Sequence, residues 1–107
     1  MSLDVYLTAT RKVEVYQANI THNLTKMADA AGIYMVCCRP DELGFTKAGQ
    51  LIPHLKAGLK KLKKSPAKYK KFDSPNGWGI YENFVPWVEK YLNACEENPD
   101  ADVEVSR

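Results

Sequence analysis

The chain has 107 residues, of which 45% are hydrophobic and 26% charged, and its formal net charge is +2 at pH 7. This composition is typical of a globular protein rather than a disordered chain, and no apolar run approaches the ~20 residues that cross a bilayer. The first residues, "MSLDVYL", lack the pattern of a signal peptide, so we expect a single soluble, cytoplasmic domain over residues 1–107.

Alternating hydrophobic residues predict strands at both ends of the chain. Residues 3–9 and 12–20 each have this period, and the intervening "TATRK" predicts a hairpin turn. Residues 101–107 repeat the alternation and predict a third strand. A third strand is expected because an isolated hairpin is marginally stable in water.

Helical spacing of hydrophobic residues begins after the second strand. It covers residues 24–31, with Gly32 placed to end that helix. A second helix is predicted from a Thr46 cap to Leu62, and Pro53 inside it predicts a kink or a restart.

Two further helices are predicted at residues 65–72, with Ser65 as the cap, and at residues 81–95, which contain Pro86. The element order predicts an α+β fold. In it, the N-terminal β-hairpin and the C-terminal strand form a small antiparallel sheet with three to four helices packed on one face.

The cysteines predict reduced, buried thiols. Cys37, Cys38 and Cys95 are odd in number, two of them are adjacent, and neither C-x-x-C nor H-x-x-x-H spacing occurs. We therefore expect neither a disulfide framework nor a metal site, and no cofactor.

Polar residues gather where the second strand is followed by the first helix, at Asn19, Thr21, His22 and Asn23. A helix start exposes unpaired N–H groups, which favour phosphates and carboxylates. In one interpretation Thr21 or Asn19 caps the helix while His22 and Asn23 reach a bound ligand. In the other, the cluster is a cap with polar neighbours bonded to nearby loops. The sequence supports both.

Two further stretches could contact a ligand. In "NGWGIY", Asn76 and Trp78 precede Tyr81, so the two aromatic rings could stack on a nucleobase; alternatively Trp78 fills the core beside a turn. In "CCRPDELG", Arg39 could clamp a phosphate or take part in a surface ion pair.

Charge is segregated along the chain. Residues 47–71 contain nine Lys and no acidic residue, whereas residues 72–107 contain eight acidic residues. This asymmetry predicts either a surface for phosphate or nucleic acid, or two solvated helix faces that attract one another. No motif of nucleophilic catalysis occurs, and a general base at His22 stays open.

The motifs "ANITHNL", "AGIY", "RPDE", "NGWG-x-Y" and "VSR" resemble, over nearly the whole chain, a family of small proteins of phages, prophages and related mobile elements. This family has no assigned reaction, so the resemblance implies no catalytic residue. The segment "MVCCRPDE" departs from it, with cysteines where bulky apolar or aromatic residues are expected. The resemblance implies action without catalysis in the cytoplasm of a bacterial host, by sequestering a defence molecule or blocking a host protein.

We therefore expect a non-catalytic phage-type protein that binds a small anionic, nucleotide-like ligand, as a sponge of host immune signals, with homo-oligomer formation left open. The expected ligand-binding residues are Asn19, Thr21, His22, Asn23, Arg39, Asn76, Trp78 and Tyr81. The alternative is an interaction module that binds an acidic protein or nucleic acid through its Lys-rich face.

Overall fold

A computed structural model of the chain describes residues 2–8, 14–21, 24–73, 77 and 79–106. The strands are β1 (Ser2–Thr8), β2 (Glu14–Thr21) and β3 (Asp102–Ser106). The α-helices are α1 (Thr25–Ala30), α2 (Tyr34–Cys38), α3 (Ile52–Lys64), α4 (Pro66–Lys70) and α5 (Tyr81–Glu97). Two 3-10 helices, η2 (Pro40–Leu43) and η3 (Ala48–Gln50), lie between α2 and α3.

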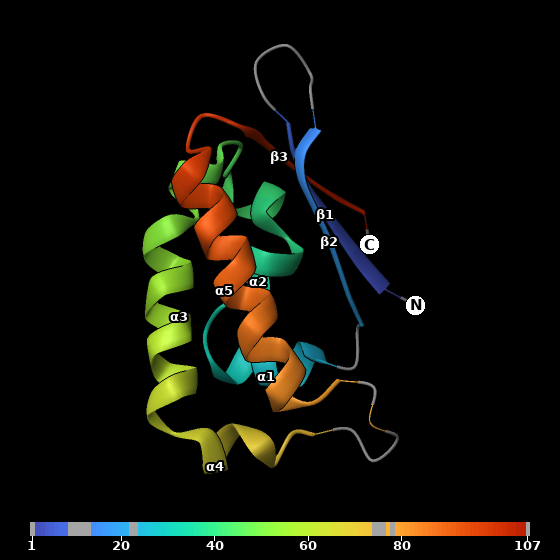
Figure 1. Cartoon of the computed structure of the whole chain (residues 1–107), viewed down its shortest axis with the longest axis vertical. Coiled ribbons are helices and arrows are strands. Elements are labelled where there is room, and N and C mark those ends of the chain that lie inside the picture. Colours follow the sequence, from blue (N-terminus) through green and yellow to red (C-terminus); the bar gives the residue numbers. More distant parts are fainter. Residues whose placement is uncertain (1, 9–13, 22–23, 74–76, 78, 107) are drawn as a thin grey trace.

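The predicted α+β class is confirmed. The strands form one antiparallel sheet in the order β2-β1-β3, so the C-terminal strand pairs with β1. Leu3, Val5 and Leu7 of β1 are buried, whereas the residues between them are half-buried. The helices gather on one face of the sheet (Figure 1), which is the face that these three side chains fill.

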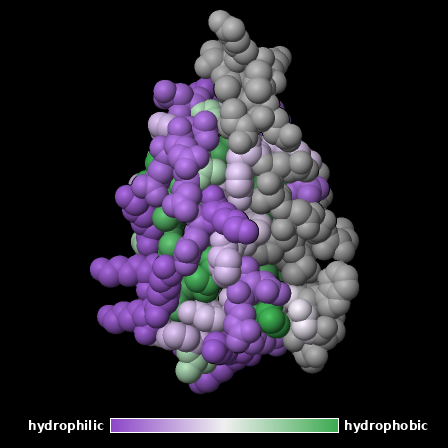
Figure 2. All heavy atoms as spheres, viewed as in Figure 1, coloured by the Kyte–Doolittle hydropathy of each residue, from purple (hydrophilic) through white to green (hydrophobic). Residues whose placement is uncertain are grey.

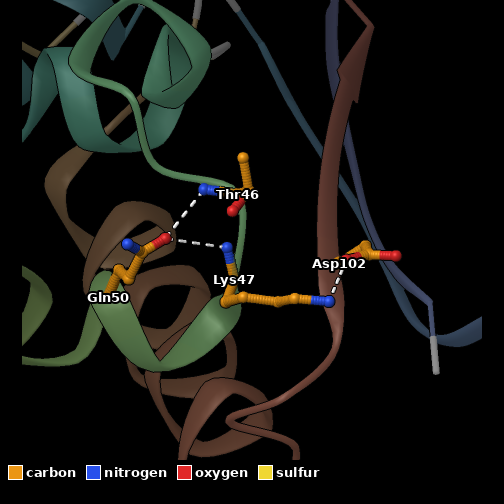
Figure 3. Close-up of polar contacts among 4 residues, drawn as sticks. All are labelled: Thr46, Lys47, Gln50 and Asp102. Carbon is orange, nitrogen blue, oxygen red and sulfur yellow. Dashed lines mark hydrogen bonds and ion pairs between the residues drawn. The ribbon is translucent and has the colours of Figure 1, made fainter. Parts of the chain in front are cut away.

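The residues before α3 pair with the start of β3 and extend the sheet at that edge. The Ala48 N–H donates to the Ala101 carbonyl (2.9 Å), and the Val103 N–H donates to the Thr46 carbonyl (2.9 Å). Lys47 and Asp102 lie opposite each other and form an ion pair (Figure 3). This pairing anchors the chain at the point where it enters α3.

The start of this helical region differs from the sequence prediction, in which Thr46 was the cap. The side-chain oxygen of Gln50 accepts hydrogen bonds from the backbone N–H groups of Thr46 (2.8 Å) and Lys47 (2.9 Å), as Figure 3 shows. The prediction of a Thr46 cap is wrong, because η3 begins after Lys47 and its first N–H groups, those of Ala48 and Gly49, donate to the backbone carbonyls of Ala101 (2.9 Å) and Pro99 (2.8 Å). Pro53 then lies in the first turn of α3, so it marks a restart, as one of the two predicted possibilities.

The predicted end of the first helix is confirmed at Gly32, which has a φ of +78°. Its N–H donates to the Asp29 carbonyl (3.0 Å), and the Ile33 N–H donates to the Ala28 carbonyl (2.9 Å). These two bonds are those of a Schellman motif. The turn leads directly into α2, which with η2 occupies a segment where no helix was predicted.

Candidate functional site

A hollow of about 380 Å³ lies where α1 meets α2. The described residues that line it are Thr25, Lys26 and Asp29 of α1 and Tyr34 of α2. Met27 and Ala28 are buried on the inner face of α1, so Lys26 and Asp29 come from its solvent-exposed side. The Gly32 turn sets the angle between the two helices and so brings Tyr34 to the same hollow.

Arg39 supports this site through Tyr34. Its Nε donates to the Tyr34 hydroxyl oxygen (3.3 Å), and its Nη1 donates to a Glu42 carboxylate oxygen (2.6 Å). These bonds raise the pKa of Arg39, the bond to Tyr34 most, so its positive charge is permanent. Because the Tyr34 oxygen accepts this bond, its own O–H remains available to donate to another group.

A further cation reaches the same turn from α3. A Cβ placed on Gly32 would lie 3.5 Å from Nζ of Lys61, so this ammonium group sits beside the C-terminal end of α1. The negative end of a helix dipole favours a cation at this position. The hollow and the adjacent turn therefore have both signs of charge. The cations are Lys26, Arg39 and Lys61, and the carboxylates are those of Asp29 and Glu42.

Of the four residues predicted to form a polar site before α1, the structure describes the backbone of Asn19 and Thr21. The backbone register pairs Asn19 with Asp4 and Thr21 with Ser2, so both are strand residues of β2. The N-cap of α1 is Leu24, whose own side chain makes no capping hydrogen bond. The prediction that Thr21 or Asn19 caps the first helix is wrong, because pairing with β1 continues through Thr21. His22 and Asn23 lie outside the described residues.

The predicted aromatic pair is likewise only partly described, because Asn76 and Trp78 lie outside the described residues. Tyr81 is described, and its hydroxyl donates to the Leu62 carbonyl (2.8 Å). In a longer helix this carbonyl would accept from the N–H of residue 66, but that residue is Pro66, which has no N–H. Tyr81 thus supplies the donor that Pro66 lacks.

Other contacts also occupy Tyr81. Its backbone N–H donates to the Asp73 carboxylate (2.7 Å), and Nζ of Lys70 lies 5.6 Å from the centroid of its ring. The partners of Tyr81 come from α3, α4 and the turn after α4, whereas those of Arg39 come from α2 and η2. The contacts of the described residues therefore associate Arg39 with the hollow and assign Tyr81 to the joint between α3 and α5.

All nine lysines of residues 47–71 are exposed. Three of them form ion pairs with acidic side chains of the described residues: Lys47 with Asp102, Lys56 with Glu96 (3.6 Å) and Lys63 with Glu89 (2.9 Å). The last two pairs join α3 to α5, as expected if the basic and acidic helix faces attract one another. Figure 2 shows hydrophilic side chains projecting from the side of the molecule on which α3 lies.

The three thiols are reduced and buried, as predicted. Burial, with smaller effects from the neighbouring thiols, raises the pKa of Cys37, and burial also raises the pKa of Cys95 to about 12. The rings of Tyr16 and Tyr91 stack nearby at a centroid distance of 6.0 Å. The Tyr91 hydroxyl and the Trp87 indole nitrogen are buried and have no hydrogen-bond partner among the described residues.

Within the described ranges, no group of three or more His, Cys, Asp or Glu residues is arranged to hold a metal ion. No helix in that part of the chain has both the length and the apolar character needed to cross a membrane. Comparisons with protein-family models, curated proteins and solved structures find no match to this chain. The resemblance of its motifs to phage-type proteins therefore stays a prediction.

The residues that line the hollow were not among those predicted to bind a ligand. Lys26 and Asp29 are three residues apart and fall between the hydrophobic positions of α1, so their place on its outer side could be read from the sequence. Tyr34 could not be assigned in the same way, because its position depends on the Gly32 turn and on a helix that the hydrophobic pattern does not predict.

Proposed function

We propose that this protein binds a small anionic, nucleotide-like ligand in the hollow between α1 and α2, without catalysis. The hollow itself carries the proposal, because its volume of about 380 Å³ falls in the range of small-molecule sites, roughly 300–1,000 Å³. The three thiols are buried, and burial raises the pKa of Cys37 and Cys95, which makes these two poor nucleophiles.

The mixture of charges around the hollow favours a nucleotide over a bare anion. Lys26 supplies a cation for phosphate, and the Thr25 and Tyr34 hydroxyls can donate to phosphate oxygens. Asp29 would repel phosphate but accepts hydrogen bonds from ribose hydroxyls, as acidic residues do in dinucleotide sites. Arg39 orients Tyr34 and has further N–H groups for a second phosphate.

The resemblance to phage-type proteins adds a biological role to this proposal. We infer that the ligand is a nucleotide signal of host immunity, which the protein sequesters in the bacterial cytoplasm as an anti-defence sponge. Asn19, Thr21, His22 and Asn23 precede α1 in the chain and are proposed to extend the site. Asn76 and Trp78 are proposed to hold the base, and formation of a homo-oligomer is part of the same proposal.

Isothermal titration calorimetry with linear nucleotides, cyclic nucleotides and inorganic phosphate tests the proposal. We expect Lys26→Ala to weaken binding of every ligand. Asp29→Asn should improve the binding of phosphate, because it removes a negative charge that repels phosphate. It should also lower the preference for nucleotide over phosphate, because Asn is a weaker acceptor than Asp for the ribose hydroxyls. Lys90→Ala, which removes an exposed lysine from α5, is the matched control and should leave binding unchanged.

The proposal is overturned if folded protein gives no heat with any nucleotide of the panel. It is also overturned if nucleotides bind but Lys26→Ala and Tyr34→Ala leave the affinity unchanged, because the ligand would then occupy another site. Circular dichroism and a thermal melt of each variant establish that it is folded before it is titrated.

A further inference from the structure

The lysines of residues 47–71 fall into two groups. Three are paired with acidic residues, as described above, and six have no acidic partner among the described residues. We call these six the lysine surface: Lys60, Lys61, Lys64, Lys68, Lys70 and Lys71. It extends over the second half of α3, over α4 and into the turn that follows.

Lys60 and Lys64 define the outer side of α3. They are four residues apart and exposed, whereas Leu55 and Leu62 of the same helix are fully buried. Residues with this spacing are neighbours on a helix, so two like charges there repel each other and destabilise the free helix. A bound polyanion would remove this repulsion and add attraction to each ammonium group.

We propose that the lysine surface binds the phosphate backbone of nucleic acid without reading its sequence. Bases are read chiefly by Arg or Lys at guanine and by Asn or Gln at adenine, and this surface has lysines alone, without the planar Arg or amide side chains that read a base with fixed geometry. Lysine contributes a mobile point charge, which suits phosphate contacts that position a protein without specifying sequence.

An acidic protein is the less suitable partner for this surface. Protein interfaces rest on buried aromatic and Arg anchors, and lysine is depleted from them. The large hydrophobic side chain next to the lysine surface, Phe72, is 36% exposed. A single such ring can stack on an unpaired base but does not form the hydrophobic centre of a protein interface.

The number of lysines predicts how strongly salt should weaken binding. Each neutralised phosphate contributes a slope of about −0.9 to a plot of log affinity against log salt for duplex DNA, and about −0.7 for a single strand. Six contacts, the largest number that this surface offers, therefore set a limit near −5 for a duplex and near −4 for a single strand.

Fluorescence anisotropy with labelled DNA at several salt concentrations tests this inference. Two duplexes of unrelated sequence should bind with equal affinity, and the single strands of the same sequences show whether stacking on Phe72 adds to the charge contacts. Replacing Lys60 and Lys64 together by Gln should reduce the magnitude of the salt slope by about 2, because two phosphate contacts are lost.

The double variant Lys56→Gln/Lys63→Gln is the matched control. It removes the same charge from the same helix, but from lysines that already pair with Glu96 and Glu89. The salt slope of this control should equal that of the wild type. Nucleotide binding in the hollow should be unchanged in the Lys60/Lys64 variant, so failure of this inference and failure of the proposed function are distinguishable.

Three results would each overturn the inference. One is an absence of DNA binding at low salt, and another is an equal loss of slope in both double variants, which would indicate an effect of net charge alone. The third is tighter binding of poly-glutamate than of DNA at the same salt, which would identify the lysine surface as a site for an acidic protein.

Discussion

Ile33 packs directly on the backbone of Gly58: a Cβ at position 58 would lie 2.2 Å from Cγ2 of Ile33. Both residues are buried. Ile33 lies at the end of the turn between α1 and α2, and Gly58 lies within α3. This contact therefore joins α1 and α2, the two helices of the hollow, to α3. A glycine inside a helix costs about 1 kcal/mol relative to alanine, and the close approach of Ile33 explains why it is present here.

Gly58→Ala should therefore destabilise the protein despite the better helix propensity of alanine. Overpacking a core costs about 1–3 kcal/mol, and a separation of 2.2 Å calls for the upper part of this range. After subtracting the propensity gain of about 1 kcal/mol, we expect a net loss of about 2 kcal/mol in the free energy of unfolding. Urea unfolding measures this loss directly.

An Ile33→Ala background provides the control for this substitution. It removes Cγ2 and Cδ1 of Ile33 and leaves its Cβ at 3.3 Å from the new methyl group, a tight contact that a shift of a few tenths of an ångström relieves. Gly58→Ala should then be nearly neutral or stabilising. An equal loss of stability in both backgrounds would show that the contact with Ile33 is not the cause.

The start of η3 allows a direct comparison of two polar side chains. Gln50→Ala removes the acceptor that serves the N–H groups of Thr46 and Lys47, and loss of a cap costs ~1 kcal/mol. Thr46→Ala should change the free energy of unfolding by less than about 0.5 kcal/mol, as exposed substitutions usually do. Thermal melts of the two variants would contradict this assignment if Thr46→Ala proved the more costly change.

Tyr81→Phe tests whether this residue joins helices or binds a ligand. It removes the hydroxyl that donates to Leu62 but keeps the ring under Lys70. We expect a loss of about 1 kcal/mol, because the Leu62 carbonyl has no N–H donor at Pro66 to replace the hydroxyl. Calorimetry should find nucleotide affinity unchanged, and a loss of affinity without a loss of stability would instead support the predicted ligand role.

The elements that could be predicted from the sequence are those long enough to repeat the hydrophobic pattern of a strand or a helix several times. β1 shows three alternations, and α3 and α5 each bury a periodic stripe, so their type and inner face follow from the hydrophobic residues alone. α2 has five residues and η2 has four, which is too few to establish a period. Their boundaries depend instead on turns at Gly32 and Gly44, both with a φ of 78°.

The candidate site was less predictable than the fold, because contacts between distant residues decide it. A cluster of polar residues after a strand indicates a helix cap, yet β2 continues through Thr21 because every residue from Tyr16 to Thr21 has a partner in β1. Tyr81 matched the pattern of a stacking residue, but Pro66 created a need for its hydroxyl that no local pattern reveals. The segregation of lysines was visible in the sequence, whereas the division into paired and unpaired lysines required the structure.

Alkaline pH should destabilise the protein through its buried thiols. Burial raises the pKa of Cys95 from an ordinary value of 9.0 to about 12, and raises the pKa of Cys37 in the same direction. Below about pH 9 both the folded and the unfolded chain keep these protons, so the contribution to stability is constant. Above pH 9 the unfolded chain releases them while the folded chain retains them, so the free energy of unfolding should fall as pH rises toward 12.

The expected slope is on the order of 1 kcal/mol per pH unit for each thiol, measured by urea unfolding between pH 7 and pH 10.5. Tyr16 and Tyr91 add to this decline above pH 10, since burial raises the pKa of both phenols. Cys95→Ala isolates the contribution of one thiol, because it should be less stable than the wild type at pH 7 but lose less on going to pH 10.5. Parallel curves for the two proteins would contradict the assignment, as would rapid reaction of the folded wild type with a thiol reagent at pH 8, because a buried, protonated thiol reacts only after the chain unfolds.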